Sequence, residues 1–256
     1  MDSMRKGNTV SVQIQKKFYS KEQSQERPIK IYLNNQPMAI SQGTPNDLAE
    51  LAVGFLLSEG LITDRNKLKE VVADIQQASV NVLSEESFDA HHPLMQRVTS
   101  AGCAQTALLN GAEPKVFERA QNLRFKAQDL LGMMKQLCEA SPRRNSGECV
   151  HGCGVGKEGK LSCVREDIGR HNAMDKLIGQ AWLDRLDMTD MALFTTGRIS
   201  HEMALKASQA GVSVIVSHKS VTDAGIEVAD GLGITLVGKC RNDSMQVMSH
   251  HERIVS

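Results

Sequence analysis

Residues 191–217 read MALFTTGRISHEMALKASQAGVSVIVS and combine two short apolar runs with a helical segment. Residues 191–195 and 212–217 have the length and composition of buried strands. Between them, residues 199–210 carry apolar side chains at helical spacing, which predicts a helix. A strand, a helix and a second strand in this order are typical of a βαβ unit with parallel strands.

The same alternation extends on both sides of this unit. Upstream, residues 161–164 predict a strand and residues 171–184 a helix. Downstream, a helix is expected over 222–231 and a strand over 234–237. The C-terminal half is therefore expected to have an α/β fold with a mostly parallel sheet covered by helices.

The N-terminal part has a different pattern. Residues 29–33 and 37–40 predict two strands joined by a turn at Asn34-Asn35, and further strands are indicated near 71–72 and 80–83. We therefore expect a smaller, β-rich N-terminal portion.

Two helices are expected outside the alternating region. In the first, Thr44 is placed to cap the helix, Pro45 suits its first turn, and Gly60 is placed to end it. The second is predicted over residues 126–140, where apolar side chains follow helical spacing.

Composition excludes several classes of protein. The 256 residues contain 30 Lys and Arg and 30 Asp and Glu, so the formal net charge is zero, which argues against general nucleic-acid binding. Aromatic residues make up only 4%, which argues against base stacking. No apolar run reaches the roughly 18 residues of a membrane span, and residues 1–10 lack the apolar core of a signal peptide. We expect a cytoplasmic protein that binds neither nucleic acid nor membrane.

The cysteines predict thiol chemistry rather than a disulfide framework. Cys103 lies among small residues, which favours an accessible thiol, and position 106 is Thr, so no Cys-x-x-Cys is formed there. Cys149 and Cys153, with Cys163 beyond, are a weak zinc pattern, and small residues entering a packed strand or helix explain them as well. We expect no resident metal ion.

Functional side chains gather where strands are expected to end. Arg165, Asp167, Arg170 and His171 surround one strand-to-helix turn, where a helix N-terminus favours anions. Thr196, Gly197 and Arg198 follow the next predicted strand, and residues 217–220 and 239–241 follow the last two. His151 follows a turn-rich loop and is a further pocket candidate. Together these segments predict a large ligand that carries phosphate groups.

Four segments resemble the FdhD/NarQ family, the formate dehydrogenase accessory sulfurtransferases. They are Thr44-Pro45 with Gly54-Phe55-Leu56-Leu57-Ser58-Glu59-Gly60, then residues 165–173 (REDIGRHNA) with Asp175-Lys176, then residues 196–200 (TGRIS) with Glu202-Met203 and Lys206, and Leu236-Val237-Gly238 with Arg241. The resemblance runs over residues 27–250, with a tentative subdivision into a β-rich portion, 1–125, and an α/β cofactor-binding portion, 126–256.

The resemblance implies a fold and an activity. The fold would be a cytidine-deaminase-like three-layer αβα domain in the C-terminal half, with a smaller β-rich N-terminal portion, in a homodimer. A cysteine desulfurase would pass persulfide sulfur to the protein. The protein would transfer it to the molybdenum (or tungsten) of a bis(molybdopterin guanine dinucleotide) cofactor, the bound substrate, for the catalytic subunit of formate dehydrogenase.

The resemblance also implies site residues. Cys103 takes the position that carries the persulfide. The cofactor-binding stretch near the C-terminus corresponds to Lys239, Cys240, Arg241, Asn242, Asp243 and Ser244. To these we add, from the anion argument, His151, Arg165, Asp167, Arg170, His171, Thr196, Gly197 and Arg198.

Two alternatives remain at this stage. Many family members carry Cys-Gly-x-Cys where this chain has Cys103-Ala104-Gln105-Thr106, so the protein could instead be a non-catalytic cofactor chaperone that never carries sulfur. A zinc hydrolase or deaminase would need His-x-Glu and Pro-Cys-x-x-Cys. The first occurs only at His250-His251-Glu252, and the second is absent from the sequence.

Overall fold

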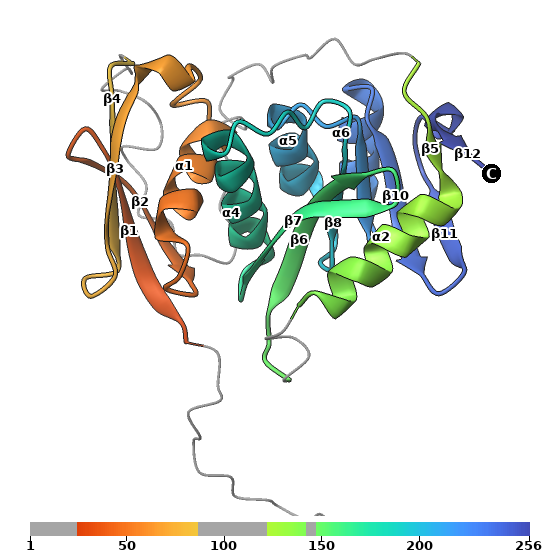
Figure 1. Ribbon diagram of the computed structural model, residues 1–256, viewed down its shortest axis with the longest axis horizontal. Helices are drawn as coiled ribbons and strands as arrows, with labels where there is room; N and C mark the ends of the chain where they lie inside the picture. The colour runs from red at the N-terminus through yellow and green to blue at the C-terminus, as the bar shows by residue number, and fades with distance from the viewer. Residues whose placement is uncertain (1–24, 87–121, 142–146) are drawn as a thin grey trace, which may run out of the picture.

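The computed structural model describes residues 25–86, 122–141 and 147–256 (Figure 1). The N-terminal part forms a four-stranded sheet in the order β2-β1-β4-β3. Its strands are β1 (Arg27–Leu33), β2 (Gln36–Gly43), β3 (Leu68–Asp74) and β4 (Ser79–Ser84). A short 3-10 helix, η1 (Arg65–Lys67), precedes β3. The predicted strands and the Asn34-Asn35 turn are confirmed, and both turn residues have positive φ.

Helix α1 (Leu48–Ser58) covers this sheet. Its apolar side chains form one core with those of β1, β2 and β4, including Ile29, Ile31, Leu51, Leu56 and Val82. The helix ends as predicted, because Gly60 has a positive φ and its N–H donates to the carbonyl oxygen of Leu57.

The C-terminal part forms a six-stranded sheet in the order β11-β10-β9-β8-β6-β7. Its strands are β6 (His151–Lys157), β7 (Lys160–Asp167), β8 (Ala192–Thr195), β9 (Val214–Ser217), β10 (Thr235–Arg241) and β11 (Ser244–Val247). A separate two-stranded sheet pairs β5 (Phe125–Lys126) with β12 (Ile254–Val255). The expected boundary between residues 125 and 126 falls inside β5.

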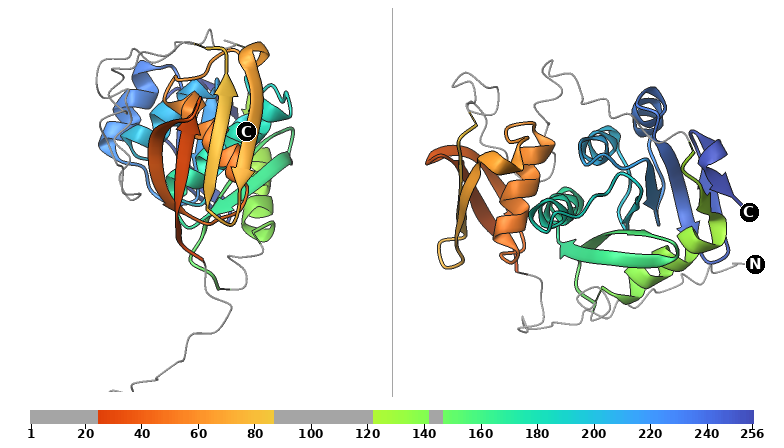
Figure 2. Two further views of the ribbon diagram at one scale, coloured as in Figure 1. Left: turned by 90° about the vertical axis from the view of Figure 1, so that its left-hand side faces the viewer. Right: turned by 45° about the horizontal axis from the view of Figure 1, so that its top comes forward.

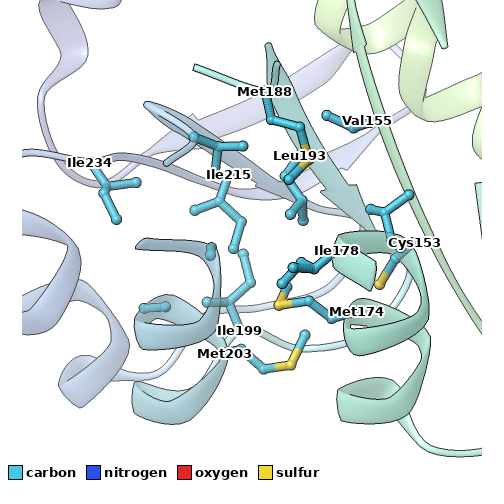
Figure 3. Close-up of a cluster of buried hydrophobic side chains, with 14 of the residues drawn as sticks. Cys153, Val155, Met174, Ile178, Met188, Leu193, Ile199, Met203, Ile215 and Ile234 are labelled. Atoms are coloured by element: carbon cyan, nitrogen blue, oxygen red, sulfur yellow. The ribbon is translucent and has the colours of Figure 1, made fainter. Parts of the chain in front are cut away.

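Helices pack on both faces of the six-stranded sheet. Successive side chains of a strand point to opposite faces, so the apolar strands β8 and β9 place buried side chains on both faces of the sheet. On one face, α2 (Ala127–Glu139) contacts Phe194 and Val216. On the other lie α4 (Arg170–Leu183), α5 (His201–Gln209) and α6 (Asp223–Gly231), over Leu193 and Ile215. Figure 3 shows side chains of this second core, which includes Cys153.

The two parts meet where α1 crosses α4, and Figure 2 (right) shows α1 between the four-stranded sheet and α4. The crossing is close because both helices carry glycine at the contact. A Cβ atom added to Gly54 would lie 1.8 Å from the carbonyl oxygen of Asp175, and one added to Gly179 would lie 1.9 Å from that of Glu50. The glycines therefore fix how the N-terminal part sits on the C-terminal sheet.

Three expectations need correction. The six-stranded sheet is mixed, not mostly parallel: β8, β9 and β10 are parallel, but β6, β7 and β11 pair antiparallel with their neighbours. Strand β6 was not predicted, because three glycines interrupt its apolar pattern. Thr44 does not cap α1, and Pro45 is not its first residue, because the helix begins at Leu48 after Asp47. The Thr44 hydroxyl instead accepts a hydrogen bond from the N–H of Ile168.

In the three described ranges, no helix has both the length and the apolar character needed to cross a membrane.

Candidate functional site

The predicted strand-end segments share one edge of the six-stranded sheet. The parallel strands β8, β9 and β10 end there. Strand β6 is antiparallel to both β8 and β7, so β7 runs in the same direction as β8 and also ends at this edge. His151 at the start of β6 is in register with Asp167 at the end of β7, and Cys153 is in register with Thr195. We call this set of strand ends the candidate edge. It brings together residues that lie up to ninety positions apart in the sequence.

The turn after β8 is held by its own hydroxyl groups. Thr196 exchanges hydrogen bonds with Gly152: the Thr196 N–H donates to the Gly152 carbonyl, and the Gly152 N–H donates to the Thr196 hydroxyl, each at 2.9 Å. The Gly197 carbonyl accepts from the Ser217 hydroxyl at 2.6 Å. These bonds fix the backbone beside Arg198, whose side chain is exposed.

Asp167 organises the turn between β7 and α4. Its carboxylate is fully buried, lies 2.7 Å from the Lys176 ammonium, and accepts from the N–H groups of Thr44 and Gly169 at 3.0 and 2.8 Å. The Lys176 ammonium also donates to the Thr44 carbonyl. With its oxygens committed in this way, Asp167 positions the start of α4 and joins it to the segment that precedes α1.

A second buried ion pair lies beside the first, because Asp175 directly precedes Lys176 in α4. The Lys206 ammonium is 2.8 and 2.9 Å from the two oxygens of Asp175 and 3.9 Å from Glu59. Burial alone would lower the pKa of Lys206, but the nearby carboxylates of Asp175 and Glu59 outweigh it and raise the pKa. The sequence signal for this cluster was the family resemblance, because Glu59, Asp175 and Lys206 all belong to its motifs.

A cavity of about 210 Å³ opens at the β7–α4 end of the candidate edge. Its polar lining includes His151, Arg170, His171 and Asp175, and its apolar lining includes Phe55. The first turn of α4 lies here, and its N-cap, Gly169, has no side chain to occupy the free N–H groups. Two predicted donors, Arg170 and His171, and a helix N-terminus therefore meet at one cavity, an arrangement that suits an anionic group.

Glu202 of α5 orients the histidine in this cavity. The His171 Nε2 atom is 3.1 Å from a Glu202 oxygen, and both side chains are largely buried. Burial raises the pKa of Glu202, but the hydrogen bond and charge of His171, with the charges of Lys206 and Arg170, lower it overall. Sequence analysis placed His171 in the pocket but gave Glu202 no role beyond its part in the family motif, because Glu202 lies on another helix.

Arg165 lies on the α1 side of β7. Its guanidinium is 3.5 Å from Glu50 and 3.8 Å from Asp47, so it joins β7 to the start of α1. It is not among the residues that line the cavity.

The opposite end of the candidate edge is the β10–β11 hairpin. Lys239, Arg241, Asn242, Asp243 and Ser244 are exposed there, and the Lys239 N–H donates to the Lys219 carbonyl, which ties the hairpin to the turn after β9. Cys240 is placed differently from its neighbours. Its side chain is buried in the core under α2, and burial raises the pKa of its thiol to about 11.

The cysteines separate into buried and accessible thiols. Burial raises the pKa of Cys153 to about 12 and that of Cys163 to about 11, so both stay protonated at neutral pH. Cys149 is exposed. Cys103, the expected catalytic residue, lies outside the described residues. Within the described ranges, no group of three or more His, Cys, Asp and Glu side chains is arranged to hold a metal ion.

Comparisons with known proteins now place the chain. The FdhD/NarQ family model matches residues 24–255. The sulfur carrier protein FdhD of Bacillus pumilus is 32% identical, over 90% of this chain and 89% of the relative. The crystal structure assigned as a formate dehydrogenase accessory protein from Desulfotalea psychrophila superposes with a TM-score of 0.72 at 28% identity, over 90% of this chain and 89% of that one.

A dCMP deaminase from the cyanophage S-TIM5 superposes with a TM-score of only 0.32 at 16% identity, over 43% of this chain and 94% of its own. A superposition this weak does not bear on the expected likeness to cytidine deaminases, which stays a prediction. The family match, in contrast, extends from before β1 to the last strand. The chain therefore belongs to the FdhD/NarQ family.

Proposed function

We propose that this protein is a sulfur carrier that takes persulfide sulfur from a cysteine desulfurase onto Cys103. It then transfers the sulfur to the molybdenum or tungsten of bis(molybdopterin guanine dinucleotide), for the catalytic subunit of formate dehydrogenase. The observation that carries the proposal is the likeness, over 90% of the chain, to proteins named sulfur carrier protein FdhD. The proposal includes a homodimer in the cytoplasm.

The loading step needs an accessible thiolate. The Cys103 thiolate attacks the outer sulfur of the desulfurase persulfide; the donor S–S bond breaks, and the desulfurase cysteine leaves as a thiolate with the electron pair. No external oxidant or reductant is required. Cys153, Cys163 and Cys240 are poor candidates for this attack, because burial raises the pKa of each thiol and keeps it protonated.

The candidate edge suits the cofactor as cargo. Guanine dinucleotides carry phosphate groups, and exposed Arg198, Lys219, Lys239 and Arg241 follow three neighbouring strands of the edge. At the other end, Arg170 and the first turn of α4 offer N–H donors in a cavity. Phosphate binding by such donors is short and charge-assisted, so these residues would hold and orient the nucleotide portions.

Formate dehydrogenase activity in cells tests the function. In a strain lacking its own accessory protein, the wild-type chain is expected to restore activity and Cys103→Ala to abolish it. Cys149→Ala, which removes another exposed thiol, serves as the matched control and is expected to restore activity. Undiminished activity with Cys103→Ala would contradict the proposal.

A non-catalytic cofactor chaperone is the second candidate. It is favoured by one observation, the presence of Thr106 where many family members have a second loop cysteine. A chaperone predicts that Cys103→Ala restores activity while Arg198→Gln with Arg241→Gln does not. A sulfur carrier predicts that both variants fail.

A further inference from the structure

A second cavity, of about 270 Å³, lies at the opposite end of the molecule from the candidate edge. Helices α4 and α5 begin at the edge, at Arg170 and His201, and end beside this cavity, at Leu183 and Gln209. We call it the Trp182 cavity. It is lined by Leu57, Arg65, Ile178, Trp182, Met188 and Gln209, among others.

Much of the wall is apolar. Ile178 and Met188 are 3% and 7% exposed, and Leu57 and Trp182 are half-buried. The guanidinium carbon of Arg65 lies 4.8 Å from the centre of the Trp182 ring, so the cation covers one face of the indole. A ligand in this cavity would contact an apolar surface and a cation at the same time.

Two hydrogen-bond donors on the wall have no acceptor. The Arg65 Nε and Gln209 Nε2 atoms are buried, and within the described part of the chain neither has a hydrogen-bond partner. Buried donors are normally satisfied, and an unmet one indicates a missing acceptor. Arg65 and Gln209 both line the cavity, so the cavity is the place where an acceptor for either donor would bind.

The charges around the cavity favour a negative acceptor. In the described ranges, Arg65 forms no ion pair, and burial and the charge of Arg185 both lower its pKa. The carboxylate of Asp187 on the same wall accepts from the N–H and hydroxyl of Thr189 at 2.9 and 2.8 Å, and in the described ranges it forms no ion pair with Arg65. Arg65 thus lines the cavity without a carboxylate partner from the described chain.

We propose that the Trp182 cavity binds a small carboxylate with a short apolar body. The carboxylate would accept hydrogen bonds from Arg65 and Gln209, and the apolar body would pack on Trp182, Ile178 and Met188. This site is separate from the candidate edge and does not depend on sulfur transfer.

Trp182 is the single tryptophan of the 256 residues, so its fluorescence reports on this cavity alone. Titration of the full-length protein with hexanoate is expected to give a saturable change in emission. Hexanamide, which lacks the charge, and hexylamine, which reverses it, are expected to give none at the same concentrations. Equal binding of the amide, or no saturable change with hexanoate, would overturn the proposal.

Variants test the two donors by calorimetry, since a change at Arg65 also alters the baseline emission of Trp182. Arg65→Gln and Gln209→Leu are each expected to weaken hexanoate binding about tenfold, the effect of losing one hydrogen bond to a charged group. Lys69→Gln changes an exposed cation whose partner is Glu85, and it should bind like wild type. Unchanged affinity in Arg65→Gln, with the melting temperature preserved, would contradict the assignment.

A peptide arm distinguishes the source of the carboxylate. An amidated hexapeptide with Asp next to Leu presents the same chemistry on a protein segment. Binding of hexanoate with a higher affinity than the peptide supports a small-molecule site. Binding of the peptide alone would overturn it and indicate a docking site for a protein partner.

Discussion

The two ends of the candidate edge handle charge in opposite ways. At the β7–α4 end, most charged side chains are buried or largely buried in pairs: Asp167 with Lys176, Asp175 with Lys206, and His171 with Glu202. At the β10–β11 end, Lys239 and Arg241 are exposed, and within the described residues neither forms an ion pair.

The difference indicates a division of labour along one sheet edge. Buried pairs are costly to break, because removal of one partner leaves an uncompensated charge in a poorly solvated place. They therefore hold the cavity and the start of α4 in one geometry. Exposed cations contribute little to folding and remain available to an anionic ligand. Substitutions at the two ends should consequently affect different measurements.

The largest expected effect comes from Lys206→Met at the buried end. It leaves the carboxylates of Asp175 and Glu59 without their cation, and we expect a loss of about 3–5 kcal/mol in the free energy of unfolding. Urea denaturation at neutral pH measures it. Lys69→Met, at an exposed ion pair, is the control and should change stability by less than about 1 kcal/mol. A similarly small change in the free energy of unfolding for both variants would contradict the difference between buried and exposed ion pairs.

Gly54→Ala should have the next largest effect. The new Cβ would lie 1.8 Å from the Asp175 carbonyl oxygen, so α1 must move away from α4, at a cost of about 3 kcal/mol. Gly132→Ala in α2 is the matched control, because nothing lies within 4 Å of its Cβ position. Alanine there should raise stability by about 0.5–1 kcal/mol. Equal destabilisation by the two variants would argue against a close helix crossing.

Glu202→Gln should change the pH dependence of stability. His171 and its neighbouring cations lower the pKa of Glu202 below the usual glutamate value of about 4.5, so the ionised carboxylate stabilises the fold above that pH. This stabilisation is lost as the pH falls through the lowered folded-state pKa. At pH 7 the free energy of unfolding of the wild type should exceed that of Glu202→Gln by about 1 kcal/mol or less, and this difference should vanish in acid. Chemical denaturation from pH 3 to 7 measures it, and a constant difference would contradict the pairing.

The smallest effect on folding is expected for Arg198→Gln combined with Lys239→Gln. Both side chains are exposed, so stability should change by less than about 0.5 kcal/mol. Binding of the probe GDP, a guanine nucleotide, should weaken at least tenfold and lose part of its salt dependence. Calorimetry at two salt concentrations measures both. Unchanged GDP affinity would show that these cations do not contact the nucleotide.

The gathering of the strand ends could be predicted from sequence, but the pairing of charges could not. Alternating strands and helices predict that residues 195–198, 217–220 and 239–241 meet at one edge, since parallel strands end on the same side. The positions of His151 and Asp167 on that edge depend on two antiparallel strands. One of these, β6, contains Gly152, Gly154 and Gly156, which obscure its strand pattern.

Long-range contacts explain the other differences. Thr44 has the local pattern of a helix cap, but its N–H donates to the carboxylate of Asp167, 123 positions away. Its hydroxyl accepts from the N–H of Ile168. The contact of Glu202 with His171 could not be predicted, because it depends on α5 packing beside the start of α4. Cys240 lies between exposed residues in the sequence, yet the strand alternation turns its side chain into the core.

Intact-protein mass spectrometry is the most direct test of sulfur carriage by Cys103. The wild type, Cys103→Ala and Cys149→Ala are each incubated with a cysteine desulfurase and cysteine. A gain of about 32 Da per sulfur, reversed by a reductant, is expected for the wild type and Cys149→Ala but not for Cys103→Ala. An equal gain in Cys103→Ala, or no gain in the wild type, would contradict the account.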